Sequence, residues 1–220
     1  VCDAIHPVGF ELLKKEQDIN VIDAVNTPKD ELLKILGEAD VAITRSSTEV
    51  NEAFLNAGKK LKAIVRAGVG VDNVDIEGCS RRGIIAIPTA NTIAAVELTM
   101  AHMLASARSL EYAHNDLKLD RIWKREKWYG VELFKKKLGV IGFGNIGSRV
   151  AVRAKAFGME IIAYDPYIDP SKVIDMGGTY TKNFDDILAC DFITIHTPKT
   201  KETTDMIGAK EIAKMKDGVR

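Results

Sequence analysis

The sequence predicts an α/β protein with two domains, each built around a parallel sheet. Short β-branched runs alternate with helical stretches from residue 20 to residue 88, and the same alternation restarts at residue 136. Between these segments, residues 91–117 have the pattern of one long helix, a suitable connection between domains. Apolar strands that alternate with helices are typical of parallel sheets covered on both faces. We therefore expect a first domain over residues 1–89 and a second over residues 90–220.

Local signals set the elements of the first domain. Thr27 is the expected N-cap of a helix with Pro28 at its first position, where the missing N–H of proline costs nothing. Gly58 and Gly83 are expected to end two further helices, since glycine readily takes the conformation that ends a helix. The strands are expected at 20–25, 40–44, 61–68 and 84–88, and the helices at 27–36, 47–58 and 73–83.

The second domain repeats the alternation. Its first strand is expected within residues 136–144 and runs into a glycine turn, and a helix over 145–158 follows. Residues 217–220 have the pattern of the start of another strand. The remaining strands are expected at 160–165, 178–181 and 191–197, and the remaining helices at 184–190 and 208–216.

The expected connection between the domains has two parts. The long helix over 91–117 carries a face of small residues suited to close packing. Residues 120–133 are basic and contain both tryptophans, a composition that also occurs in nucleic-acid contacts. Because the segment is short and the chain is neutral, we interpret it as a solvated connection. The small-residue face consists of Ala94, Ala95, Leu98, Ala101, His102, Ala105 and Leu110.

Composition narrows the classes of function. The chain has 31 Lys and Arg against 31 Asp and Glu, and 46% of its residues are hydrophobic. These values exclude a disordered chain and argue against a general nucleic-acid binder, which would have a basic face. No apolar run approaches the roughly 20 residues of a membrane helix, and the first residues lack the pattern of a signal peptide. We expect a cytoplasmic protein without membrane or nucleic-acid partners.

Cysteine and histidine spacing indicates no metal site. The three cysteines form no CxxC pair and the four histidines show no HxxxH spacing. We expect thiols that are buried or half-buried in a reducing compartment, and no bound metal. The residues concerned are Cys2, Cys79, Cys190, His6, His102, His114 and His196.

The strongest functional signal is a GxGxxG motif formed by Gly142, Gly144 and Gly147. An apolar strand precedes it, a helix follows it, and the next strand ends in Asp165, 18 residues after Gly147. In such a unit the glycines allow a tight turn, close approach of the backbone to a pyrophosphate, and close packing of the helix on the strand. An acid at the position of Asp165 accepts hydrogen bonds from ribose hydroxyls and repels a 2′-phosphate. The motif predicts a Rossmann-type domain that binds NAD rather than NADP.

Two further segments are candidate binding loops. Thr197 and Pro198 follow a strand next to the glycine turn, where they would contact a cofactor or simply begin a loop. In the first domain, the segment RAGVGVDNVD starts at Arg66 and continues as a glycine-rich loop. Arg45 and Ser46 end the preceding strand in the same way. Such arginines are natural partners of a carboxylate or phosphate, and a solvated pair is the alternative.

These segments together resemble the D-isomer-specific 2-hydroxyacid dehydrogenases, most closely the phosphoglycerate dehydrogenase branch of that family. The resemblance covers nearly the whole chain. It implies a flavodoxin-like substrate-binding domain, a Rossmann-type NAD-binding domain, and hydride transfer between nicotinamide and C2 of a 2-hydroxy or 2-oxo acid. The matching stretches are TRSSTEVN, IVRAGVGVDNVDIEGCSRRGI, PTANTIAAVELTM, WYGVEL, KLGVIGFGNIGSRVA, AYDPYI, DFITIHTPKTKET and MIG.

The resemblance also implies site residues. The N–H groups of Asn145 and Ile146 match those that meet the pyrophosphate, and Val69 matches a position near both substrate and nicotinamide. The connection before Asn91 is shorter than is usual in the family, which leaves the placement of Asn91 open. The positions that match substrate contacts are Arg45, Ser46, Arg66, Gly68, Val69 and Asn91.

Two arginines near one loop favour a doubly anionic substrate, so the implied reaction is 3-phosphoglycerate to 3-phosphohydroxypyruvate in serine biosynthesis. A glyoxylate, hydroxypyruvate or D-lactate enzyme is the alternative within the family. An NAD-binding corepressor of the same fold is the alternative outside enzymes. The long helix and the segment with Trp123, Trp128 and Tyr129 imply a homodimer or a larger even oligomer.

No catalytic residue is assigned within the 220 residues. In the family, an Arg, a Glu and a His that act in catalysis follow the strand that is expected to begin at 217–220. The chain therefore resembles a fragment without the catalytic segment and without the helix that returns to the substrate domain. We expect the 220 residues alone to be inactive.

Overall fold

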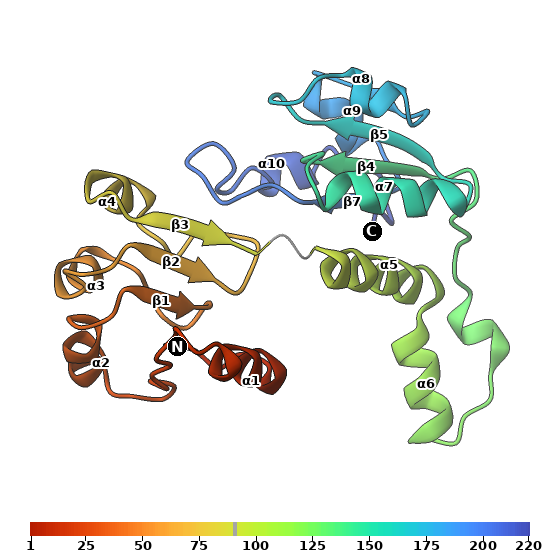
Figure 1. Cartoon of the computed structure of the whole chain (residues 1–220). Helices are drawn as coiled ribbons and strands as arrows, with labels where there is room; N and C mark the ends of the chain where they lie inside the picture. Colours follow the sequence, from red (N-terminus) through yellow and green to blue (C-terminus); the bar gives the residue numbers. More distant parts are fainter. Residues whose placement is uncertain (90–91) are drawn as a thin grey trace. The chain divides into compact units, whose positions relative to one another are not determined.

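The computed structural model describes residues 1–89 and 92–220, and it divides into two compact units, Val1–Asn91 and Thr92–Arg220. Each unit contains its own sheet, and every strand pairing within the two sheets is parallel (Figure 1). The division lies two residues after the expected boundary. The α/β class with parallel sheets is confirmed.

The first unit has a three-stranded sheet in the order β1-β2-β3. The strands are in register so that Thr44, Arg66 and Pro88, the last residues of the three strands, lie side by side at one edge. The strands are β1 (Val41–Thr44), β2 (Ala63–Arg66) and β3 (Ile85–Pro88), and the helices are α1 (Pro7–Lys15), α2 (Lys29–Leu36), α3 (Glu52–Ala57) and α4 (Ile76–Arg81).

The core of the first unit lies on one face of this sheet. Ala42 and Ile64 are buried there in one cluster with Leu36, Phe54 and Leu55 from α2 and α3. Residues on the opposite face are half-buried or exposed, and Ile85 is 64% exposed. Apolar residues on both faces led us to expect helices on both, but in the described chain only the face of Ala42 is packed in this way.

Several boundaries in the first unit differ from the prediction. Residues 20–25 form no strand. Their backbone bonds join Val1 N to Ile22 O, Ala24 N to Val1 O and, in a turn, Thr27 N to Ala24 O. Thr27 does not cap α2, whose N-cap is Pro28 without a side-chain bond. Helix α3 starts only at Glu52, because the Asn51 side chain accepts from the N–H groups of the first turn.

The second unit has a four-stranded sheet in the order β6-β5-β4-β7. Its strands are β4 (Lys137–Ile141), β5 (Glu160–Tyr164), β6 (Thr179–Tyr180) and β7 (Phe192–Ile195). The helices packed with this sheet are α7 (Gly147–Ala156), α8 (Ser171–Ile174) and α9 (Phe184–Leu188), and α10 (Ala209–Ile212) follows β7. The backbone of Arg220 bonds to Asp191 and Ile193 beside β7, as expected for the start of another strand.

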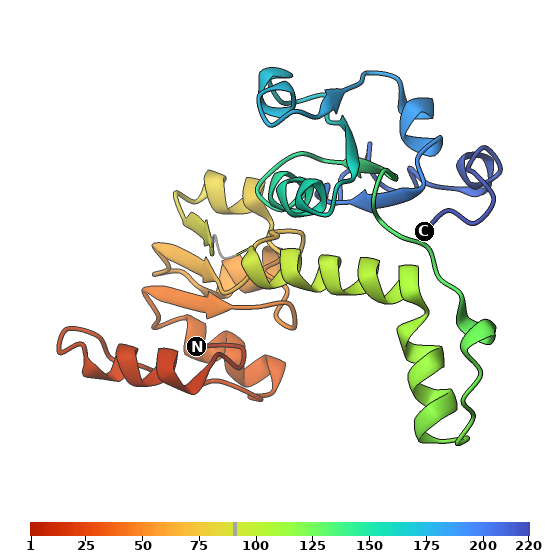
Figure 2. The same ribbon diagram turned by 90° about the vertical axis from the view of Figure 1, so that its right-hand side faces the viewer.

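Helices cover both faces of this second sheet. A methyl group added at Gly139 would meet Ile187 of α9, whereas one added at Gly147 would meet Val140. Because neighbouring residues of a strand point to opposite faces, α9 and α7 lie on opposite sides of β4. Figure 2 shows the same unit turned by 90°. The prediction of a sheet covered on both faces is confirmed for this unit.

The expected long helix is two helices, α5 (Ile93–Arg108) and α6 (Leu110–Lys118). Ser109 between them has φ of 51°, a left-handed conformation that ends the first helix. The periodic pattern runs through this break, so the sequence did not reveal it. Helix α5 buries Val96, Met100, Met103 and Ala107, whereas the predicted small-residue face is largely exposed, with Leu98 57% exposed.

The tryptophan segment is more ordered than the solvated connection that we expected. The short 3-10 helix η1 (Arg125–Trp128) brings Trp128 onto α6. There the indole stacks on Tyr112 at 5.1 Å between ring centroids, and its Nε1 donates to Asp116 Oδ2 at 2.7 Å. Trp123 and Tyr129 are 74% and 78% exposed. The buried Asp116 therefore fixes one aromatic side chain and leaves two on the surface.

Candidate functional site

The glycine turn between β4 and α7 is sterically tight at two positions. Gly142 has φ of +85°, and a methyl group there would lie 2.8 Å from the carbonyl carbon of His196 and 2.9 Å from Thr197 Cγ2. A methyl group at Gly147 would lie 2.0 Å from the Gly142 carbonyl oxygen. Both contacts are closer than a Cβ tolerates, so these glycines are required by the fold of the turn itself.

Gly144 differs, because a methyl group there would meet no atom within 4 Å. Gly144 and Asn145 are exposed, and Ile146 is half-buried. In the described chain, the backbone N–H groups of Asn145 and Ile146 donate to no protein acceptor. They lie at the N-terminus of α7, which favours negative charge. The turn thus offers open space and donors of the kind that fit a dinucleotide pyrophosphate.

Asp165 lies directly beside this turn, at the end of β5. Its Oδ2 accepts from the N–H of Phe143 at 2.8 Å, and its Oδ1 accepts from the N–H of Tyr167 at 3.0 Å. These two bonds fix the orientation of the half-buried carboxylate. A carboxylate oxygen has more than one acceptor site, so Asp165 retains capacity for ribose hydroxyls.

The third side of the turn is the loop after β7. The N–H of His196 donates to Ile141 O at 2.7 Å, which places Thr197 against Gly142. Burial lowers the pKa of the His196 imidazole, whose Nε2 lies 2.9 Å from Thr194 Oγ1. Pro198 is exposed at the start of the following loop, and its carbonyl oxygen accepts from Thr203 Oγ1. The structure thus brings Thr197, Asp165 and the glycine turn together.

One contact joins the two loops that flank the glycine turn. The Tyr167 hydroxyl, after β5, donates to the Glu202 carboxylate, after β7. This hydrogen bond raises the pKa of Tyr167, because a phenolate would face the negative charge of Glu202.

In the first unit, Arg66 and Ser46 come together at the ends of β2 and β1. Arg66 is only 8% exposed, its Nε donates to Asn73 Oδ1 at 2.8 Å, and its Nη2 lies 3.4 Å from Ser46 Oγ. A methyl group at Gly68 would lie 2.2 Å from Arg66 Nη1, so the glycine leaves room for the guanidinium. Arg45 is exposed and its Nη1 donates to Ala4 O at 3.0 Å. Val69 is exposed in the same loop, and Asn91 lies outside the described residues.

Three residues of this cluster were not singled out from the sequence: Asp3, Thr48 and Asn73. Asp3 is 7% exposed and accepts from the N–H groups of Arg45 and Thr48 and from the Thr48 hydroxyl. Asn73 Nδ2 donates to the carbonyl oxygens of Arg45 and Thr48. Asn73 lies within the RAGVGVDNVD segment and was a possible candidate, whereas nothing in the sequence marks Asp3. A cavity of about 460 Å³ lies beside the cluster, lined in part by Asp3, Ser46 and Thr48.

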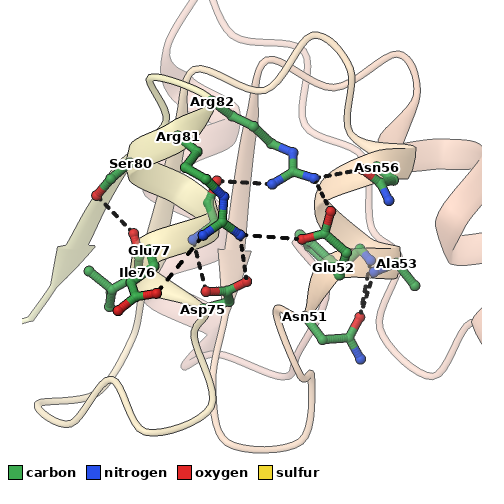
Figure 3. A network of polar contacts seen from close by, with 12 residues as sticks. Asn51, Glu52, Ala53, Asn56, Asp75, Ile76, Glu77, Ser80, Arg81 and Arg82 are labelled. Carbon is green, nitrogen blue, oxygen red and sulfur yellow. Dashed lines mark hydrogen bonds and ion pairs between the residues drawn. The ribbon is translucent and has the colours of Figure 1, made fainter.

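A second polar network holds the helices behind this loop (Figure 3). Arg82 Nη2 pairs with Glu52 and donates to Asn56 Oδ1 at 2.7 Å. Asp75, which ends the glycine-rich loop, caps α4 by accepting from the N–H of Gly78 at 2.8 Å. The capping hydrogen bond of Asp75 therefore fixes the C-terminal end of the glycine-rich loop to α4.

Comparison with known proteins identifies the family. Residues 100–220 match the model described as D-isomer specific 2-hydroxyacid dehydrogenase, NAD binding domain. A hydroxypyruvate reductase of Thermotoga maritima is 41% identical over 100% of this chain and 71% of its own length. The chain belongs to the D-isomer specific 2-hydroxyacid dehydrogenase family. The resemblance recognised in the sequence is confirmed, and NAD is the cofactor of this domain type.

Two further matches extend the comparison. A D-3-phosphoglycerate dehydrogenase of Synechocystis is 42% identical over 100% of the chain. The chain spans 40% of that relative's length, and similar fractions of the other phosphoglycerate dehydrogenases that it matches. The crystal structure of D-lactate dehydrogenase from Aquifex aeolicus, complexed with NAD and lactic acid, superimposes with a TM-score of 0.77 at 32% identity. The superposition covers 88% of this chain and 57% of the Aquifex aeolicus chain.

The described residues show two further absences. In residues 1–89 and 92–220, no helix has both the length and the apolar character needed to span a membrane. Within the same ranges, no three or more His, Cys, Asp or Glu side chains gather as a metal ion would require.

Proposed function

We propose that this protein is an NAD-dependent dehydrogenase that oxidises 3-phosphoglycerate to 3-phosphohydroxypyruvate. The strongest support for an anionic substrate comes from the hydrogen-bond partners of the Arg66 and Arg45 guanidinium groups. Within the described chain neither guanidinium has a carboxylate partner, and the buried Arg66 is held only by the neutral Asn73 and Ser46. A buried positive charge without a counter-charge is costly. An anionic ligand at Ser46, Gly68 and Val69 would remove that cost.

The geometry of the second unit supports the proposed cofactor residues. NAD, when bound, accepts the hydride from C2 of the substrate. In this proposal the N–H groups of Asn145 and Ile146 hold the pyrophosphate, and Gly144 keeps the space open for it. Asp165 binds the adenosine ribose, while Thr197 and Pro198 line the adenosine side of the turn. The carboxylate of Asp165 favours NAD over NADP by repelling a 2′-phosphate.

Proton transfer needs a further group, since the substrate hydroxyl loses its proton as the hydride leaves. We propose that the 220 residues alone do not supply it. In the described chain His196 bonds to Thr194 and not to a carboxylate, and burial lowers its pKa, which makes it a weaker proton acceptor. A positioned base is worth about 10²–10⁴-fold in rate, so the isolated segment should show no useful turnover.

The test is NADH formation by the full-length protein with 3-phosphoglycerate at alkaline pH, beside the 220-residue segment alone. We expect turnover only in the full-length protein. Equal turnover by the segment would place a catalytic base within these residues. Hydroxypyruvate, glyoxylate and D-lactate or its oxo acid are assayed in parallel, because the similarity to a hydroxypyruvate reductase makes that activity the second candidate. NAD binding without turnover of any of them would favour a corepressor-like role.

We also propose that the protein assembles as a homodimer or larger even oligomer in the cytoplasm. Support comes from the exposed small residues Ala94, Ala95 and Ala101 on α5 and from the exposed aromatic residues Trp123 and Tyr129 in the segment that follows α6. The three cysteines are free, which suits a reducing compartment. Sedimentation at micromolar concentration tests the assembly, and a clean monomer would contradict it.

A further inference from the structure

We propose that Asn73 is a positioning residue, which holds the Arg66 guanidinium and the backbone of residues 45–48 in one fixed arrangement. The proposal rests on the proposed function, because that arrangement presents both arginines to an anionic substrate. Asn73 lies in the glycine-rich loop after β2 and has no role in the chemical step.

The amide of Asn73 connects three separate points. Its Oδ1 accepts from Arg66 Nε at 2.8 Å, while Nδ2 donates to Arg45 O at 2.6 Å and to Thr48 O at 2.7 Å. A primary amide has two N–H donors, and both are used here. The side chain thus connects the end of β2 to the segment that follows β1.

Asp3 forms hydrogen bonds to the same segment, residues 45–48, through the N–H groups of that segment. It accepts from the N–H of Arg45 and, at 3.2 Å, from the N–H of Thr48. Asn73 donates to the carbonyl oxygens of Arg45 and Thr48, and Asp3 accepts from their N–H groups. Both the N–H and the C=O of each residue are therefore hydrogen-bonded to a side chain. This bonding restricts where Ser46 and the Arg45 side chain can lie.

The chemistry at position 73 requires an amide. A carboxylate would still accept from Arg66, but it has no N–H to donate to the two carbonyl oxygens. It would also neutralise Arg66 and remove the charge that an anionic substrate needs. An apolar side chain would free the guanidinium to change rotamer. Both Asn73→Asp and Asn73→Ala therefore disturb the arrangement, for different reasons.

The test compares Asn73→Ala and Asn73→Asp with Asn56→Ala in the full-length protein. Asn56 is a matched control, since it also accepts from an arginine of the same unit, Arg82 (Figure 3), but belongs to α3 and not to the segments that follow β1 and β2. We expect Asn73→Ala to raise KM for 3-phosphoglycerate about tenfold or more, the loss expected of a hydrogen bond to a charged group. We expect kcat and KM for NAD to change by less than about twofold, and Asn73→Asp to raise KM further. Asn56→Ala should leave both KM values unchanged.

A structural role alone gives a different result. In that case Asn73→Ala and Asn56→Ala lower thermal stability alike, and KM for 3-phosphoglycerate stays at its original value, which would overturn the proposal. A second readout needs no turnover. In crystal structures of the full-length variants, the Arg66 guanidinium should move in Asn73→Ala and stay in place in Asn56→Ala. An unmoved Arg66 overturns the proposal, whereas a moved Arg66 in a protein inactive on hydroxy acids supports it and refutes the proposed function.

Discussion

The two units form polar sites at the ends of their strands by different means. In the second unit, the glycine turn offers backbone N–H groups, and its shape is fixed by contacts that leave no room for a side chain at Gly142 and Gly147. In the first unit, side chains form the site, and Asp3 and Asn73 fix its shape through hydrogen bonds. Steric constraint thus shapes one site and hydrogen bonding the other. We expect substitutions to disrupt the first by clash and the second by lost partners.

The largest effect is expected for Gly147→Ala. The new methyl group would lie 2.0 Å from the Gly142 carbonyl oxygen, which is backbone and cannot rotate away. We expect a loss of about 3 kcal/mol or more of unfolding free energy, at the upper end for overpacking. Denaturant unfolding of the full-length protein measures it. A stability unchanged within error would show that the turn is not constrained by this contact.

Arg66→Lys should affect the first unit without unfolding it. Lysine keeps the positive charge but lacks the planar fork that reaches Asn73 and Ser46 together. We expect KM for 3-phosphoglycerate to rise by about tenfold to a hundredfold, as for the loss of charge-assisted hydrogen bonds. The affinity for NAD, measured by calorimetry, should be unchanged. An unchanged KM would remove Arg66 from the proposed substrate site.

Gly144→Ala separates ligand binding from folding in the second unit. Its methyl group meets no protein atom within 4 Å, so unfolding free energy should change by less than about 1 kcal/mol. A methyl group in that space would obstruct the pyrophosphate, and we expect NAD to bind about tenfold more weakly. Calorimetric titration measures the affinity for NAD. Normal NAD affinity would mean that the pyrophosphate does not occupy this space.

An effect of the same size as that of Gly144→Ala is expected for Asp165→Ala, on the choice of cofactor. The substitution removes both the acceptor for ribose hydroxyls and the repulsion of a 2′-phosphate, so the preference for NAD over NADP should narrow by about tenfold. Titration of both cofactors into the full-length protein measures the ratio. Tighter binding of NADP than of NAD by the unmodified protein would contradict the role of Asp165.

The second unit was more predictable from sequence than the first. Its glycine motif and Asp165 are close in the chain, and the geometry that they require is local. Strands β4, β5 and β7 and even the short β6 lie within the expected ranges. Local signals failed where one residue altered a regular pattern, as Ser109 does between α5 and α6.

The first unit depends on contacts that the sequence does not display. Asp3, Arg45 and Asn73 are separated by up to 70 positions, and only the fold brings them together. Helix α1 was also missed, although Pro7 at its first position is a recognisable start signal; its cap, the His6 side chain, is not a residue type that usually marks a helix start. Arg66 and Ser46 were assigned to the substrate site from the family resemblance, and the structure places them at or just after the ends of the neighbouring strands β2 and β1.

The most direct test of the account is whether the two units hold different ligands. It requires NAD and 3-phosphoglycerate affinities for the full-length protein and for its Gly144→Ala and Arg66→Lys variants. We predict that Gly144→Ala weakens only NAD binding and that Arg66→Lys weakens only 3-phosphoglycerate binding. The assignment of the two sites would be wrong if Arg66→Lys weakened NAD binding and left 3-phosphoglycerate binding unchanged. It would also be wrong if Gly144→Ala weakened 3-phosphoglycerate binding and left NAD binding unchanged.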